Sequence, residues 1–174
     1  MSLPGISNRA IEETSMRLQM QTKDILSLCS PFTALPSTPF TIKSKLSQHT
    51  YLATRGHTNY LIKFLLTQDG LQQEVNFLVE VVLLALAMQT QTACPLSPKF
   101  YHLAPAPFCL KVKDTSRKTM MVLEYFESGS LERVFSDPSS RRSILQKGWR
   151  FILQVFGAVA SAIQFLHSNH FIHG

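Results

Sequence analysis

The chain has 174 residues, of which 45% are hydrophobic and 16% charged, and 17 Lys and Arg outnumber 11 Asp and Glu to give a net charge of +6. This length allows one ordinary domain, or a small domain with an appendage, and the apolar content with its 12 Phe excludes disorder over most of the chain. Because the basic residues are scattered rather than interleaved with aromatic residues in a stripe, we expect no nucleic-acid partner.

Three features bear on the cellular compartment. The cysteines Cys29, Cys94 and Cys109 are odd in number, and no two of them have CxxC spacing. The first residues lack the basic segment and following apolar segment of a secretory signal. The longest apolar candidate without a charge, residues 151–166, falls short of the roughly 18 residues that a membrane span needs. We therefore expect an intracellular, cytoplasmic protein without a membrane span.

Residues 1–39 are predicted to be an N-terminal extension that ends in a linker. The stretch 8–28 is weakly amphipathic, with aliphatic residues at seven-residue intervals. Residues 30–39 contain three prolines among Ser and Thr, and this composition excludes a helix and indicates a linker. The sequence therefore predicts a domain boundary near residue 39.

Residues 40–66 have the composition of β-strands, and the clearest strand is 60–66. Side chains alternate between the two faces of a strand, so Lys63 shares one face with Leu61 and Leu65. Lys63 is thus the single charge in a strand whose faces are otherwise apolar. One interpretation is an edge-strand lysine that extends to water; the other is a lysine with a buried partner.

Residues 72–88 are predicted to form a helix, because Phe77, Val81, Leu84 and Met88 recur at helical spacing. Glu80 is the only charged residue between Phe77 and Met88. An unpaired carboxylate on such a helix costs several kcal/mol, so we expect Glu80 to be paired, protonated or at the rim of the helix. The lysine of the preceding strand is the expected partner.

The second half of the chain is predicted to begin with a proline-rich connection and a β-hairpin, whose arms are 108–113 and 119–125 around a turn at 114–117. A short helix is expected at 131–135 and a loop at 136–140. The strongest helical pattern is 151–166, whose apolar stripe must be buried against another part of the protein.

Five segments in this order resemble the N-terminal portion of a eukaryotic protein-kinase domain, over about residues 40–174. Tyr60-Leu61-Ile62-Lys63 is similar to the strand-3 motif Val-Ala-Ile-Lys, and Phe77-Leu78-Val79-Glu80 is similar to the segment that carries the helix-C glutamate. The other three are Met121-Val122-Leu123-Glu124-Tyr125 (strand 5 and hinge), Glu127-Ser128-Gly129-Ser130-Leu131, and 162–168 with Phe171-Ile172-His173-Gly174 (end of helix E and start of the catalytic loop).

The resemblance implies an α+β fold with two parts. Residues 40–126 would form the N-lobe and hinge, with an antiparallel five-stranded sheet plus helix C. Residues 127–174 would form helices D and E of an incomplete C-lobe. The activity implied is ATP-dependent phosphoryl transfer to Ser or Thr of a protein substrate, with ATP and Mg as cofactors.

The same resemblance implies the roles of individual residues. Lys63 would bind phosphate, and Glu80 would orient Lys63. Leu123 would be the gatekeeper behind the purine, and the backbone of Glu124 and Phe126 would face the adenine edge. The remaining match is His173, which corresponds to the histidine of the catalytic-loop motif.

Two departures from the family pattern limit these expectations. No glycine occurs in 46–53, where the glycine-rich loop should approach the phosphates, so nucleotide binding is expected to be weak or absent. The catalytic Asp and the metal ligands would lie after Gly174, so we expect a truncated kinase, inactive as given, with no catalytic or metal-binding residue of its own. The alternatives are a pseudokinase-like scaffold that binds a protein partner, and an unrelated α+β interaction domain in which Lys63 and Glu80 lie far apart.

Overall fold

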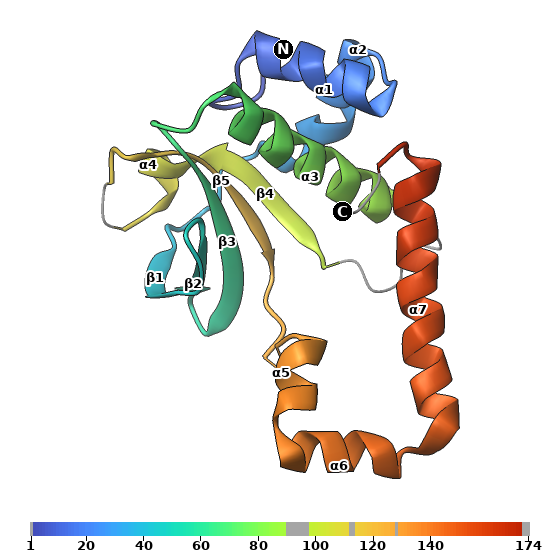
Figure 1. Ribbon diagram of the computed structural model, residues 1–174. Helices are drawn as coiled ribbons and strands as arrows, with labels where there is room; N and C mark the ends of the chain where they lie inside the picture. Colours follow the sequence, from blue (N-terminus) through green and yellow to red (C-terminus); the bar gives the residue numbers. More distant parts are fainter. Residues whose placement is uncertain (1, 90–97, 112–113, 128, 172–174) are drawn as a thin grey trace.

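The computed structural model describes residues 2–89, 98–111, 114–127 and 129–171, and over these residues the fold is α+β, as predicted (Figure 1). The elements in chain order are α1 (Asn8–Leu18), α2 (Thr22–Cys29), the 3-10 helix η1 (Ser30–Phe32), β1 (Thr41–Lys45), β2 (Thr50–Arg55), β3 (Thr58–Leu66), α3 (Leu71–Gln89), β4 (Phe100–Pro105), α4 (Ala106–Cys109), β5 (Arg117–Glu124), α5 (Leu131–Ser136), α6 (Pro138–Gln146) and α7 (Gly148–Ser168).

The five strands form one antiparallel sheet in the order β1-β2-β3-β5-β4. The predicted alternation along β3 is confirmed. Tyr60, Ile62 and Phe64 belong to a hydrophobic cluster on one face of the sheet, whereas Leu61 and Leu65 pack into the cluster that contains α3. The strand is therefore apolar on both faces because both faces are covered.

Helix α3 lies between the sheet and the two N-terminal helices (Figure 1). Ten of its nineteen residues are buried. The sequence predicts one apolar stripe, of which Phe77 and Val81 are buried, but burial extends around the helix to residues such as Leu78 and Val82. This wider burial arises because α1 and α2, from the predicted extension, cover the side of α3 that the sheet leaves free.

Of the predicted hairpin, the second arm is confirmed and the first arm is wrong. Its second arm is β5, but β5 pairs with β4, which lies in the stretch predicted to be a proline-rich connection. The predicted first arm begins inside α4, where Phe108 is 77% exposed, and residues 112–113 lie outside the described ranges. Pro107 explains the helical turn, because proline is favoured at the start of a helix and cannot donate in the middle of a sheet.

The predicted loop at 136–140 is also wrong from Pro138 onward, because α6 begins there. Asp137 is the N-cap, and its side chain accepts a hydrogen bond from the Ser140 N–H at 2.8 Å. Hydrogen bonds from Ser139 and Ser140 hold the pKa of the Asp137 carboxyl below its usual range. An aspartate followed by proline is thus a helix start here rather than an interruption.

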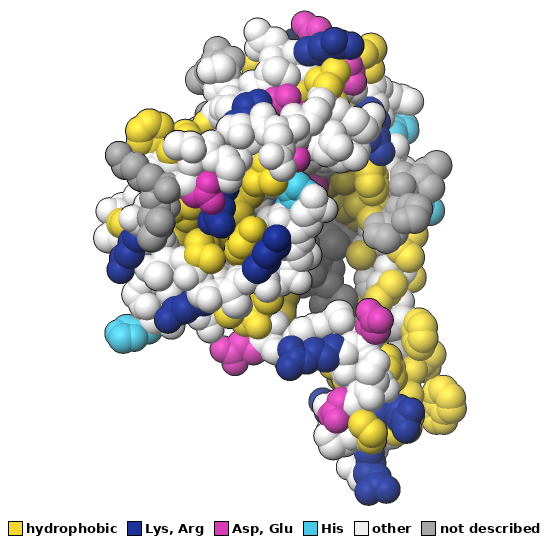
Figure 2. Space-filling model, turned by 60° about the vertical axis from the view of Figure 1, so that its left-hand side comes forward, with side chains coloured by type: hydrophobic (Ala, Val, Ile, Leu, Met, Phe, Trp, Pro, Cys, Tyr) yellow, Lys and Arg dark blue, Asp and Glu magenta, His cyan; other side chains and the backbone are white. Residues whose placement is uncertain are grey.

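Helices α5, α6 and α7 form an arm that hangs below the sheet and returns beside the end of α3 (Figure 1). The predicted helix at 151–166 is confirmed, but the predicted burial of its stripe is not: Phe156 is 68% exposed and Ile163 is 42% exposed. Phe165 alone is buried among the described residues of α7. Hydrophobic side chains are prominent along this arm, and Lys and Arg are dispersed over the visible face, the lower part of the arm included (Figure 2).

Two helices among the described residues, α3 and α7, are long and apolar enough to cross a membrane by length and composition, with a mean hydropathy of 1.5 each. The core helix of a soluble protein passes the same test, and α3 is mostly buried. The expected absence of a membrane span therefore stays a prediction.

We expect the exposed apolar arm to make the 174-residue chain self-associate, because apolar patches of this kind are rare on monomers. Replacing Leu153, 67% exposed, or Phe156 with Glu should lower the self-association measured by sedimentation velocity. The matched control is Gln154→Glu, which adds the same charge to an exposed polar position of the same helix. Equal association in all three variants would contradict this prediction.

Candidate functional site

Lys63 projects from β3 on the side of the sheet that faces α3. Its neighbours on that face are Leu61 and Leu65, and its partner across the strand pair β3–β5 is Met121. The side chain is 35% exposed, so the ammonium group lies at the edge of the apolar surface formed by these neighbours, partly in contact with solvent. A cation in this position needs a partner that offsets the water it has lost.

Glu80 supplies that partner from α3. The Lys63 Nζ donates a hydrogen bond to Glu80 Oε2, and the two groups form an ion pair. The structure thus brings together the two charges that the sequence singles out, and the wide separation expected for an unrelated α+β domain is not observed. Since both side chains are about one third exposed, the pair is open to a ligand from the solvent side.

A cavity of about 150 Å³ lies against this ion pair. Its lining residues are His49, Lys63, Phe64, Leu65, Asp69, Gln73, Asn76, Phe77 and Glu80. Asp69 Oδ2 accepts a hydrogen bond from the Leu66 N–H at 2.7 Å and lies 3.7 Å from His49 Nδ1. One lysine thus faces two carboxylates here, so the cavity attracts an anion weakly unless His49 is protonated.

The β1–β2 loop, which the resemblance equates with the glycine-rich loop, closes on itself. The N–H groups of Leu46 and Ser47 donate to the Thr50 carbonyl at 2.8 and 3.1 Å. The His49 carbonyl accepts from the Phe64 N–H on β3 at 2.8 Å. Two of the backbone N–H groups that could hold phosphate are therefore already used, and side chains stand where a close approach needs glycine.

The predicted hinge follows β5. Leu123 is 4% exposed and pairs with Leu61 across the sheet, so it lies on the same face as Lys63. The Glu124 N–H donates to the Lys99 carbonyl at 2.9 Å, and its side chain accepts from the Lys99 N–H at 3.2 Å. Phe126 is 52% exposed, and its carbonyl accepts from the Gly129 N–H at 3.1 Å. Its own N–H has no hydrogen bond to the rest of the described chain, which leaves it for a ligand.

His173, the remaining predicted site residue, lies outside the described residues. Within the described ranges no cluster of three or more His, Cys, Asp or Glu could hold a metal ion.

Of the nine residues that line the cavity, the sequence analysis assigned a role only to Lys63 and Glu80, and it assigned none to the neighbouring apolar residue Leu61. Leu61 and Leu52 face each other across β2 and β3, and Leu61 stands on the apolar surface that leads to Lys63. The signal for Leu61 was its place two residues before Lys63, on the same strand face. The signal for His49 was its place in 46–53, the stretch that the resemblance equates with the phosphate-binding loop, whereas Asp69 had no such signal, because it belongs to a turn that only the folded sheet brings to the cavity.

Other features of the described chain do not form a catalytic centre. Burial raises the pKa of the Cys29 thiol to about 12 and that of Cys109 to about 11, so both are poor nucleophiles. Burial also lowers the pKa of His102, whose ring nitrogens lie 3.1 Å from the Ala34 carbonyl oxygen and 3.5 Å from Arg55 Nη1. His102 therefore ties the linker to the sheet rather than facing a ligand.

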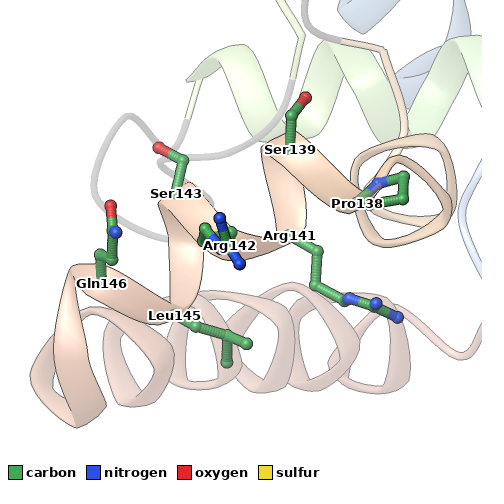
Figure 3. A pocket seen from close by; sticks show the side chains of 7 residues that line it. All are labelled: Pro138, Ser139, Arg141, Arg142, Ser143, Leu145 and Gln146. Carbon is green, nitrogen blue, oxygen red and sulfur yellow. The ribbon is translucent and has the colours of Figure 1, made fainter.

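A shallow depression along α6 carries basic and hydroxyl side chains. Ser139, Ser143 and Gln146 project from one side of the helix, and Arg141 and Leu145 from the other (Figure 3). All of these side chains are exposed, and none belongs to the Lys63 cavity. The depression is a solvated helix surface.

No protein-family model matches the chain, and no curated protein matches it.

Proposed function

We propose that residues 40–171 belong to a protein-kinase-like domain in which Lys63 is the group that binds the phosphates of ATP. The observation that carries this proposal is the Lys63–Glu80 ion pair, which joins a central strand to the one helix packed between the sheet and the N-terminal segment. The element order β1-β2-β3-α3-β4-β5 and the sheet order β1-β2-β3-β5-β4 are compatible with a kinase upper lobe. Helices α5–α7 would then be the first helices of the lower lobe.

In this proposal each residue has a role that follows from its position. The Lys63 ammonium offsets phosphate charge, and Glu80 holds the ammonium at the margin of the sheet. Leu61 and Leu123 form an apolar surface for the purine, and the free N–H of Phe126 is the hinge donor. The chemistry supported in the wider family is phosphoryl transfer to Ser or Thr of a protein.

A second candidate function is a binding module that needs no nucleotide, as in pseudokinases. The observations that favour it are the closed β1–β2 loop without glycine and the excess of carboxylates around Lys63. Both lower the affinity for phosphate, because the loop offers few free N–H groups and Asp69 repels an anion.

Titration of the full chain with a fluorescent ATP analogue, with and without Mg²⁺, separates the two candidates. We expect weak saturable binding, lowered about tenfold or more by Lys63→Met, since a charge-assisted hydrogen bond is lost. Glu80→Gln should weaken binding less, because it removes only the group that orients Lys63. The matched control is Lys43→Met, which removes an exposed lysine of β1.

The outcomes of this titration are distinct. Equal affinity for Lys63→Met and the wild type would overturn the role of Lys63. No saturable binding by the wild type would favour the nucleotide-independent module, and the search for a ligand would then turn to proteins.

A further inference from the structure

The N-terminal segment, residues 3–29, packs along α3 as a second layer (Figure 1). Its buried apolar residues share one hydrophobic cluster with α3 and with the inner face of the sheet. They are Leu3, Ile6, Ala10, Ile11, Leu18, Ile25, Leu28 and Cys29. Because α3 touches the sheet on one side and this segment on the other, the segment contributes to the orientation of the helix that carries Glu80.

Glu74 is the polar junction between this segment, α3 and the sheet. It lies in the first turn of α3 and is 6% exposed. Its carboxylate accepts hydrogen bonds from the Ser7 N–H at 2.5 Å and the Ser7 hydroxyl at 3.1 Å, and Lys118 Nζ of β5 lies at 3.3 Å. A buried carboxylate with three donors on two other elements resists displacement, since any movement leaves a charge unpaired.

A second contact fixes the same segment to the sheet. Thr119, fully buried on β5, donates its hydroxyl proton to the Pro4 carbonyl at 2.9 Å. Along α1, Arg17 Nη1 donates to Asn76 Oδ1 on α3 at 2.8 Å. The segment is therefore anchored at the start of α1 to both the sheet and α3, and at the end of α1 to α3 again.

Helix geometry links this junction to the candidate site. Glu74 and Glu80 are six residues apart, which is about 9 Å along the axis and about 120° around it. The first therefore faces Ser7 and Lys118 while the second faces Lys63. A rotation of α3 that frees Glu74 would also turn Glu80 away from Lys63.

We propose that Glu74 is a positioning residue for the Lys63–Glu80 pair, and that the N-terminal segment is the built-in partner that holds α3 in the paired orientation. The functional meaning of this inference rests on the proposed role of Lys63 in phosphate binding. The positioning itself concerns the ion pair and is measured without nucleotide.

The test is the acylation of Lys63 by an amine-reactive ester in the full chain, quantified by mass spectrometry relative to the exposed Lys43. Pairing with Glu80 lowers the reactivity of Lys63, so Glu80→Gln should raise its relative labelling by about threefold. Glu74→Ala should raise it to a similar level, and Glu74→Gln, which can still accept from Ser7, should raise it less. The double variant Glu74→Ala/Glu80→Gln should show no further increase.

The control is Phe40→Leu, a substitution in the fully buried cluster on the other face of the sheet. It should lower the melting temperature without changing Lys63 labelling. If Glu74→Ala does not fold, Ser7→Ala, which removes the hydroxyl donor to Glu74 together with the N-cap acceptor of α1 and adds no charge, should show the same rise on a smaller scale.

The inference is overturned if the Glu74 variants lower the melting temperature but leave Lys63 labelling at the wild-type level while Glu80→Gln raises it. It is also overturned if Glu80→Gln has no effect, because the pair would then not form in solution. Absence of ATP-analogue binding together with the expected labelling pattern would contradict the proposed nucleotide role and support the positioning by Glu74.

Discussion

Replacing Gly5 with Ala is expected to lower the free energy of unfolding by about 2–4 kcal/mol, an unusually large loss for a single methyl group near a chain terminus. Gly5 has a φ of 66°, in the left-handed region. A Cβ built on it would lie 2.2 Å from the Thr119 hydroxyl oxygen and 3.3 Å from Cγ of Lys118. The new methyl group must therefore push the N-terminal segment away from β5 and break the hydrogen bond between Thr119 and Pro4.

The control for this prediction is Gly56→Ala, in the turn between β2 and β3. Gly56 has a similar φ of 62°, but no atom lies within 4 Å of a Cβ at that position. Gly56→Ala should therefore lower the free energy of unfolding only by the cost of a left-handed backbone at a residue with a side chain, about 1–2 kcal/mol. Denaturant unfolding followed by circular dichroism at the helical band measures both variants, because Trp149 is 78% exposed and is a poor fluorescence probe. Equal losses of free energy in the two variants would mean that the N-terminal segment does not pack against Thr119 in solution.

Local patterns predicted those parts of the fold whose partners are close in sequence. The alternation in β3 identified both faces of the strand, because successive side chains of a strand point to opposite faces of the sheet. The pairing of Lys63 with Glu80 followed from the cost of an isolated charge on an apolar strand and helix. The hairpin failed because Phe108 and Leu110 alternate like a strand, although Pro107 places Phe108 in a helical turn.

What the sequence could not supply was the position of distant partners. The junction at Glu74 depends on Ser7, 67 residues earlier, and no periodicity connects the two. The helix α7 was predicted correctly, but the predicted burial of its apolar stripe was wrong, because such a stripe indicates that a helix needs a partner and does not name one. The kinase resemblance itself stays a proposal, since a five-stranded antiparallel sheet with one packed helix is not specific to kinases.

Truncation of Leu78 is the second substitution with a large expected effect. Its result tests whether the N-terminal segment packs on α3 and completes the hydrophobic core. Leu78 lies one turn after Glu74 on the same side of α3, off the apolar stripe that the sequence predicts, and it is fully buried. We expect Leu78→Ala to lower the free energy of unfolding by about 2–5 kcal/mol, the range for a leucine truncated inside a packed core.

The matched control is Leu153→Ala, the same chemical change at a position of α7 that is 67% exposed, which should alter the free energy of unfolding by less than about 0.5 kcal/mol. Removal of the Leu78 side chain also loosens the interface that fixes the rotation of α3. Leu78→Ala should therefore raise the labelling of Lys63 under conditions where the chain remains folded, whereas Leu153→Ala should not. Small and equal effects of the two substitutions would show that the N-terminal segment does not cover α3 in solution, and Glu80 would then be held by the sheet alone.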